Sequence, residues 1–290
     1  MDISLALGGG GSKGIAHLGV LLFLEEKGYR VRAIAGTSAG GIIAAIYAAG
    51  YSPSEILARF IEVDQTALYS KRPGDWPSIL GIEGINRVLQ DFLGDRSFDD
   101  LVISCALTAV DLDTEEEVIL RQGRVVDAVL ATMALPGIFP PQIWDGHHLV
   151  DGGLADPVPV MPVRALAPKL PVVAVALTDI APQPGNILDP PAMLNVNPLL
   201  REIARLRVAQ AFNIFLRSVA IGSRNITLLR LQIDHPEVII NPGLSDIGIL
   251  DHVDILDLVR RGRLAAQEAL PELEKANRWS QKLGRILRSN

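Results

Sequence analysis

Residues 35–41, Ala35-Gly36-Thr37-Ser38-Ala39-Gly40-Gly41, decide the fold of this chain. An apolar segment, 31–35, leads into the stretch, and a helix of small residues, about 39–49, is expected to follow it. A serine between glycines at a strand-to-helix turn matches the G-x-S-x-G nucleophile elbow, because the glycines permit the tight turn that exposes the Ser38 hydroxyl. The amides at the start of that helix would face an oxyanion formed there. The alternative is an ordinary glycine-rich turn, so the rest of the chain has to supply the context.

Length and composition place the chain among globular proteins with a substantial core. It has 290 residues, of which 49% are hydrophobic, so we expect a single domain over residues 1–290. The net charge of −6 argues against nucleic acid as a partner, because nucleic-acid-binding proteins normally carry a basic surface. The single cysteine, Cys105, excludes an internal disulfide framework, which suits a reducing compartment, and its apolar neighbours predict a buried packing residue.

A second glycine-rich stretch, Gly8-Gly9-Gly10-Gly11-Ser12-Lys13-Gly14, lies between an expected strand, 3–7, and an expected helix, 15–27. A strand, a glycine loop and a helix together predict an anion site made of backbone N–H groups. The P-loop pattern fails, because it requires serine or threonine after the lysine, whereas Gly14 follows Lys13. A dinucleotide-binding match through Gly9, Gly11 and Gly14 is partial, because no acidic residue follows the second strand at the expected place.

Strands and helices alternate along the rest of the chain. Further helices are expected over 53–63, 84–92, 124–133, 199–221 and 253–270, the first of them opened by a capping box at Ser52 and Glu55. Further strands are expected over 101–110, 117–121, 149–151, 171–177 and 226–233. This alternation predicts a three-layer α/β/α sandwich around a largely parallel sheet. Segment 67–82 is irregular and forms either a surface loop or an apolar rim of the site.

Ser38 needs a base, because a serine hydroxyl is a poor nucleophile. The chain order Ser38, Asp151, His252 matches that of an α/β-hydrolase triad. Two features disfavour this arrangement: His252 follows Asp251 at an expected helix start, and only two expected strands precede Ser38. Asp151 itself ends a short apolar strand, just before a glycine turn. Because His and Cys are not clustered with metal-ligand spacing, we expect neither a metal nor another cofactor.

The motifs, taken in their order, resemble those of the patatin-like phospholipase family. The family patterns G-G-G-x-[KR]-G, G-x-S-x-G and D-G-[GA] are matched by Gly9-Gly10-Gly11-Ser12-Lys13-Gly14, Gly36-Thr37-Ser38-Ala39-Gly40 and Asp151-Gly152-Gly153. A fourth, A-S-x-A-x-P, appears as Ala131-Thr132-Met133-Ala134-Leu135-Pro136, with threonine in place of the usual serine. The resemblance covers about 3–177, and it leaves a helical C-terminal part, about 198–290, outside its motifs.

The resemblance implies a patatin-like fold and a Ser–Asp dyad. Ser38 would attack an acyl ester, and Asp151 would take its proton and later activate water to hydrolyse the acyl-enzyme. The family's oxyanion hole maps onto Gly9, Gly10, Gly11 and Ser12, and supporting positions map onto Lys13, Gly14, Gly36, Gly40 and Gly152. An ordinary aspartate is a weak base, so we expect burial to raise the pKa of Asp151. Lys13 either anchors the glycine loop or attracts an anionic headgroup.

Two later segments bear on partners. The expected helix over 199–221 has an apolar face that packs on its own domain, packs on a second subunit of a homo-oligomer, or forms a lid. After Glu274 the chain has basic but no acidic residues, which is compatible with packing on the domain or with contact to anionic lipid. Because the sequence shows neither a basic leader nor an apolar stretch of about 20 residues, we expect a cytoplasmic protein that contacts membranes peripherally at most.

These observations favour a serine acyl hydrolase whose substrate is a lipid acyl ester, either a phospholipid or a lysophospholipid. One alternative is a soluble carboxylesterase or thioesterase that acts on small acyl groups. The other is a lipid-sensing regulatory protein that keeps the fold without turnover.

Overall fold

The computed structural model describes residues 1–65, 68, 80–178, 180 and 207–278. Its centre is an eight-stranded sheet in the order β5-β6-β3-β2-β1-β7-β8, with β4 paired to β3 off this path. The strands are β1 Asp2–Leu7, β2 Arg30–Gly36, β3 Ser104–Asp111, β4 Glu117–Leu120, β5 Gln142–Trp144, β6 His147–Asp151, β7 Val172–Val175 and β8 Val238–Ile240. β3, β2, β1, β7 and β8 run parallel, whereas β4 and β6 run antiparallel to β3 and β5 runs antiparallel to β6.

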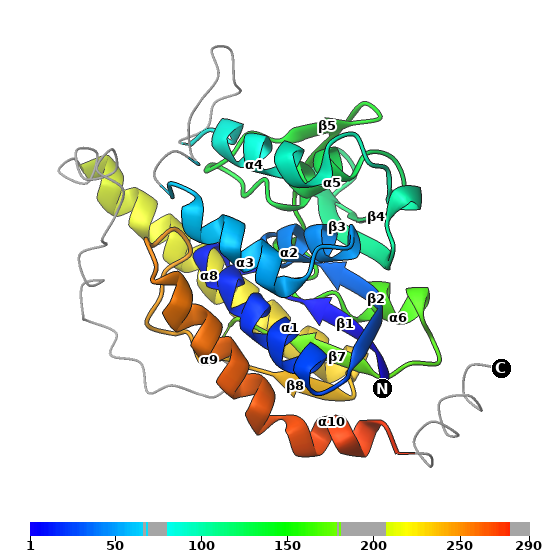
Figure 1. Cartoon of the computed structure of the whole chain (residues 1–290). Helices are drawn as coiled ribbons and strands as arrows, with labels where there is room; N and C mark the ends of the chain where they lie inside the picture. Colours follow the sequence, from blue (N-terminus) through cyan, green and yellow to red (C-terminus); the bar gives the residue numbers. More distant parts are fainter. Residues whose placement is uncertain (66–67, 69–79, 179, 181–206, 279–290) are drawn as a thin grey trace.

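Helices cover both faces of this sheet (Figure 1). They are α1 Ala16–Glu26, α2 Ala39–Ala48, α3 Pro53–Glu62, α4 Glu83–Leu93, α5 Val125–Thr132, α6 Val160–Leu166, α8 Arg207–Asp234, α9 Ile255–Glu268 and α10 Leu270–Ala276. Short 3-10 helices, η1 Gly11–Ile15, η3 Phe98–Asp100 and η4 Gly152–Leu154, join them. The predicted α/β/α sandwich around a largely parallel sheet is therefore confirmed.

The two faces of the sheet carry side chains of different size, because successive residues of a strand point to opposite faces. Leu5, Leu7 and Ile34 belong to the large core that the α1 side of the sheet shares with most of the helices. Small residues on the other face, such as Ala6 and Ala35, pack in a second core with α6 and the C-terminal half of α8. The small side chains of this face lie under α6 and the C-terminal end of α8.

α1 and α9 lie side by side and pack tightly through glycine (Figure 1). A Cβ added at Gly19 would lie 1.9 Å from the carbonyl oxygen of Val259, and one added at Gly262 would lie 2.0 Å from that of Ala16. Only glycine permits so close an approach of two helix backbones. α9 is thus held directly beside the helix that follows the N-terminal glycine loop.

Most of the expected elements are present, including the capping box of Ser52 and Glu55 at the start of α3. The expected strand 226–233 is wrong, because these residues form the last part of α8. Thr227, Leu231 and Asp234 are buried at helical spacing, and this packing decides the conformation of a short apolar run that alone suits strand or helix. The strand that joins β7 is instead β8, which the sequence did not reveal.

Some expectations concern residues outside the described part of the chain. They are most of segment 67–82, the loop before 199, the first residues of the helix expected from 199, and the basic stretch after Arg278. Cys105 is buried as expected, and its burial raises the pKa of the thiol to about 12. None of the helices in the described residues combines the length and apolarity needed to cross a membrane.

Candidate active site

Ser38 lies at a strained turn between β2 and α2. Its backbone has φ 54° and ψ −124°, a conformation that residues other than glycine rarely adopt. A Cβ added at Gly36 would lie 2.5 Å from the carbonyl oxygen of Gly40, and one added at Gly40 would lie 2.2 Å from that of Leu7. Both glycines of the G-x-S-x-G pattern are therefore required by backbone contacts around the serine.

Thr132 and Thr108, which lie outside the motif, hold this turn in place. The backbone N–H of Ser38 donates to the hydroxyl oxygen of Thr132, at the end of α5, over 3.0 Å. The hydroxyl of Thr37 donates to the carbonyl oxygen of Asp156 at 2.8 Å and lies 2.7 Å from the hydroxyl of Thr108 on β3. All three threonines are fully buried. The sequence marked Thr132 only as a departure from a family pattern and did not reveal this contact.

Asp151 ends β6 and is buried beside Ser38. The pairing of β6 with β3 brings it there, opposite Ala109. Gly152 permits the approach, because a Cβ at this position would lie 2.2 Å from the hydroxyl of Thr108. The carboxylate accepts a hydrogen bond from the backbone N–H of Gly153 at 2.8 Å, and the nearby hydroxyl of Ser38 lowers its pKa.

Burial raises the pKa of Asp151 to about 6, although the hydrogen bonds from Ser38 and Gly153 lower it in part. The direction agrees with the expectation from the sequence. A carboxylate with this pKa is mostly ionised at neutral pH, and it is a stronger base than an exposed aspartate.

The N-terminal glycine loop lies against the same serine. A Cβ at Gly9 would be 3.2 Å from the Cβ of Ser38, and one at Gly14 would be 2.6 Å from that of Ala39. The amide of Gly9 donates to the carbonyl oxygen of Pro157 and the amide of Ser12 to that of Ile249, both at 2.9 Å. Within the described residues, the amides of Gly10 and Gly11 have no such backbone acceptor.

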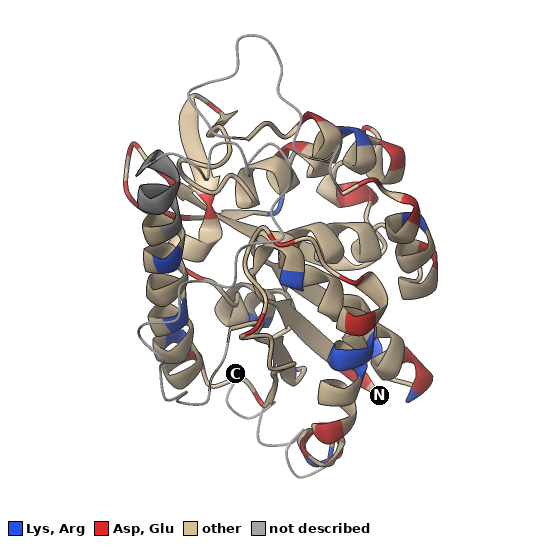
Figure 2. Ribbon diagram, turned by 90° about the vertical axis from the view of Figure 1, so that its left-hand side faces the viewer, with Lys and Arg blue, Asp and Glu red and all other residues tan. Residues whose placement is uncertain are grey.

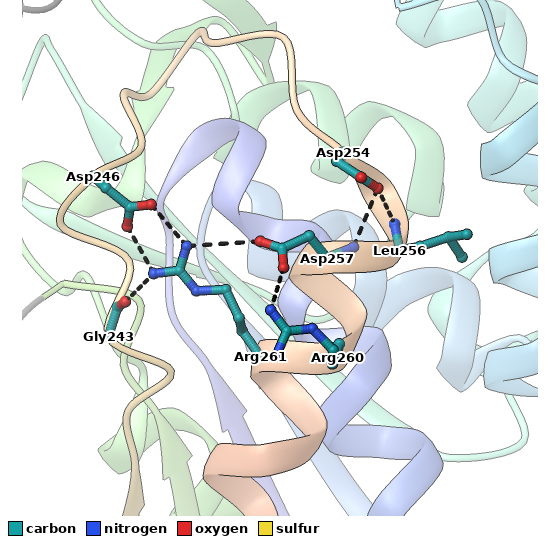
Figure 3. Close-up of polar contacts among 7 residues, drawn as sticks. All are labelled: Gly243, Asp246, Asp254, Leu256, Asp257, Arg260 and Arg261. Carbon is teal, nitrogen blue, oxygen red and sulfur yellow. Dashed lines mark hydrogen bonds and ion pairs between the residues drawn. The ribbon is translucent and has the colours of Figure 1, made fainter.

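The segment between β8 and α9 supports this loop, and Figure 3 shows the polar contacts that hold this segment to α9. Ile249 accepts from both the amide and the hydroxyl of Ser12, and a Cβ on Gly11, whose φ is +59°, would lie 2.0 Å from the Ile249 carbonyl oxygen. Arg261 of α9 holds the segment through two hydrogen bonds to Asp246, at 2.9 and 2.7 Å, and one to the carbonyl oxygen of Gly243.

Lys13 contributes to the charge balance of this segment. The hydrogen bond from Arg261 lowers the pKa of Asp246, and the positive charges of Arg261 and Lys13 lower it further. Both interpretations of Lys13, as an anchor of the glycine loop and as a ligand of an anionic headgroup, stay predictions.

An apolar cavity of about 350 Å³ opens from Ser38 and Asp151. It extends between α3, α4, α8 and the segment before α9, and its apolar lining includes Ile42, Phe60, Leu89, Phe139, Val219 and Ile226. Cavities of this size and character bind apolar small molecules.

Histidine has no part in the contacts of Asp151 in the described residues. His252 is exposed and lines the cavity, but the partners of Asp151 are Ser38 and Gly153. His17 is fully buried with its Nε2 2.8 Å from the carbonyl oxygen of Gly8, and burial lowers its pKa to about 4, so it stays neutral. These contacts disfavour the triad through His252.

Asp111, Asp113 and His147 form the one group in the described residues whose spacing would suit a metal ion, with ligand atoms within 4.8 Å of one another. His147 Nδ1 lies 2.8 Å from Asp111, and the neighbouring His148 pairs with Asp113 at 3.1 Å. These contacts link the start of β6 to the end of β3 and the turn that follows it, and we assign no metal to them.

The fold, together with Ser38 and Asp151, places the chain in the class of α/β proteins that have a serine at a strand-to-helix turn beside a buried aspartate. Its family follows from the sequence: the model of the patatin-like phospholipases matches residues 5–164, more than half of the chain. The chain belongs to this family.

Known proteins agree with this assignment. An uncharacterised NTE family protein of Mycobacterium tuberculosis is 32% identical over 189 residues, which cover 65% of this chain and 52% of that protein. Lysophospholipase NTE1 of Debaryomyces hansenii is 28% identical over 99% of this chain but only 19% of its own length. The chain spans about half the length, or less, of these relatives. VipD of Legionella pneumophila shares the fold, with a TM-score of 0.57, 14% identity, and coverage of 94% of this chain and 67% of that one.

Proposed function

We propose that this chain is a serine acyl hydrolase for lipid esters, either phospholipids or lysophospholipids. The observation that carries the proposal is the placement of the Ser38 hydroxyl beside the buried carboxylate of Asp151, where both line one apolar cavity. The family, and the lysophospholipase among the relatives, support a lipid ester as substrate.

The geometry suits acyl transfer through a covalent intermediate. Ser38 Oγ attacks the ester carbonyl carbon while Asp151 takes its proton, and the resulting oxyanion accepts hydrogen bonds from the amides of Gly10 and Gly11. The tetrahedral intermediate collapses, and Asp151 returns the proton to the leaving alcohol. Asp151 then takes a proton from water, which attacks the acyl-enzyme. Collapse of this second tetrahedral intermediate releases the fatty acid, and Asp151 returns the proton to Ser38 Oγ. The apolar cavity would hold the acyl chain throughout.

The division of roles within the glycine loop follows from its hydrogen bonds. Since the amides of Gly9 and Ser12 already donate to backbone carbonyls, these residues hold the loop in shape. Gly10 and Gly11 supply the donors. Each donor of an oxyanion hole typically contributes about 3 kcal/mol to the transition state.

Fluorophosphonate labelling with peptide mapping tests the proposal. We expect one adduct on Ser38, no adduct in Ser38→Ala, and strongly slowed labelling in Asp151→Asn. Ser104→Ala is the matched control, because this exposed serine begins β3 and does not line the cavity. Labelling that survives Ser38→Ala would identify another nucleophile, and an unlabelled but folded wild type would favour a regulatory protein. Hydrolysis measured across acyl-chain lengths then separates a lipase from an esterase for small acyl groups.

A further inference from the structure

α8 has two different faces along its length. Val219, Gly222, Ser223 and Ile226 line the cavity. At about 100° per residue, a second, exposed stripe of apolar side chains adjoins this face and covers about a third of the helix circumference. This exposed stripe consists of Ile214, Ile221, Leu229 and Ile233, whose exposed fractions are 66%, 61%, 57% and 68%.

Such exposure on one helix is unusual for a surface that only meets water. Isolated exposed apolar residues are common, but apolar residues gathered on one surface mark contact sites. In this stripe the residues between the apolar ones are small or uncharged, such as Ser218 and Asn225. α8 therefore has an exposed apolar face of the kind that helices at a membrane interface have.

The charge of α8 identifies what the stripe contacts. Before Asp234 the charged residues of α8 are Arg207, Arg217, Arg224 and Arg230, although the whole chain has a net charge of −6. Figure 2 shows basic positions, in blue, along the described part of this helix. Arg230 is neutralised by the buried carboxylate of Asp156 at 2.8 Å. Arg217 and Arg224 are seven residues apart and flank the apolar stripe on one side of the helix.

We propose that the exposed stripe of α8 docks on an anionic phospholipid bilayer, with the helix lying along the interface. The apolar residues enter the acyl boundary, and the flanking arginines meet the lipid phosphates. A second copy of this chain is a poorer occupant, because symmetric pairing would bring two cationic helices together. The inference rests on the proposed function, since docking would bring the cavity, which α8 lines beside the exposed stripe, next to its lipid substrate.

Vesicle co-sedimentation of the Ser38→Ala protein tests the docking without turnover. The vesicles contain phosphatidylcholine alone or mixed with phosphatidylglycerol. We expect binding to the mixed vesicles that weakens as salt rises. Ile221→Asp is expected to weaken it about tenfold or more, since a charge replaces an apolar side chain at the interface. The matched control is Ile143→Asp on β5, which is 67% exposed in the native protein and should bind unchanged.

A charge reversal measures the electrostatic contribution to vesicle binding. Arg217→Glu is expected to weaken binding to phosphatidylglycerol vesicles several-fold and to leave the weak binding to pure phosphatidylcholine unchanged. Arg121→Glu, an exposed arginine just after β4, serves as the control for net charge.

Three results would overturn the inference. They are failure of the parent protein to bind the mixed vesicles, equal binding by Ile221→Asp, and equal loss in Ile143→Asp. Sedimentation velocity of the same variants tests whether a second copy of this chain occupies the stripe instead. If the protein is a dimer that Ile221→Asp dissociates while vesicle binding stays intact, the stripe serves self-association. Fluorophosphonate labelling of Ser38 in solution does not depend on vesicles, so its failure would reject the proposed function separately.

Discussion

The backbone N–H of Ser38 donates a 3.0 Å hydrogen bond to the hydroxyl oxygen of Thr132, which lies 94 residues further along the chain. This bond joins the strained serine turn to the end of α5. A residue with positive φ persists only where its surroundings hold it. Thr132 is therefore a positioning residue for Ser38.

Removal of this acceptor should slow the reaction of Ser38. We expect Thr132→Val to lower the rate of fluorophosphonate labelling at least several-fold and to destabilise the fold by about 1–2 kcal/mol, because it leaves a polar N–H unpaired. Thr132→Ser keeps the hydroxyl and is expected to retain most of the rate. Denaturant unfolding measures the stability of both variants. Equal labelling by Thr132→Val and the wild type would show that the bond has no part in positioning Ser38.

The reaction should depend on pH through Asp151. Because the proton acceptor is the carboxylate, the labelling rate is expected to rise with pH and to level off above a pKa of about 6. Asp156 also titrates near this range, since burial raises its pKa to about 7. The profile of Asp151→Asn distinguishes the two: its residual rate should lack the step near pH 6.

The Asp151 carboxyl should also affect folding stability, which is expected to fall as pH rises. Its pKa is higher in the folded protein, about 6, than the ordinary value of 3.8. The folded state therefore binds the proton more tightly, and the stability gained from protonation is present below pH 3.8 and lost as pH rises through 6. Asp151→Asn is expected to be more stable than the wild type at pH 8, by up to roughly 3 kcal/mol. Urea unfolding at pH 5 and pH 8 measures the difference, which should shrink at the lower pH.

Local signals in the sequence were sufficient to predict much of this structure. The G-x-S-x-G turn and the capping box at Ser52 are determined by residues close to one another in the chain, so pattern and conformation coincide. Asp151 was found because a family pattern places it, and its burial followed from its apolar strand.

What the sequence did not reveal depends on contacts between distant segments. The run 226–233 joined α8 because Leu231 packs on the second core and Arg230 meets Asp156, neither of which has a local signal. The contact of Thr132 with Ser38 and the support of the glycine loop by Ile249 likewise arise only once the chain has folded.

The glycine loop offers a matched pair of substitutions. Gly11→Ala places a Cβ 2.0 Å from the carbonyl oxygen of Ile249 at φ +59°, so the loop has to move. We expect labelling of Ser38 to fall by at least about a hundredfold if the Gly11 amide is displaced from the oxyanion. Gly28→Ala has a similarly positive φ of +75° but nothing within 4 Å, so it should cost only backbone strain and leave the labelling rate unchanged. A comparable loss of labelling in both variants would assign the effect to folding.

Arg261 should influence the glycine loop from outside the cavity. It holds Asp246 and Gly243, and that segment carries Ile249, the acceptor for the amide of Ser12. Since the segment lies behind the proposed oxyanion donors, loss of Arg261 is expected to lower kcat for a small soluble ester more than it changes KM.

The adjacent arginine provides the control for this prediction. Arg261→Ala is expected to reduce kcat about tenfold or more, and Arg261→Lys to restore part of it, because lysine keeps the charge but loses the two-pronged contact. Arg260→Ala removes an exposed pair with Asp257 on the same helix, and such pairs contribute about 0–1 kcal/mol, so its kcat should match that of the wild type. Steady-state kinetics with thermal unfolding of each variant measures both quantities. A fall in melting temperature without a change in kcat would limit Arg261 to a structural role, because a displaced Ile249 carbonyl must alter the loop that contacts the transition state.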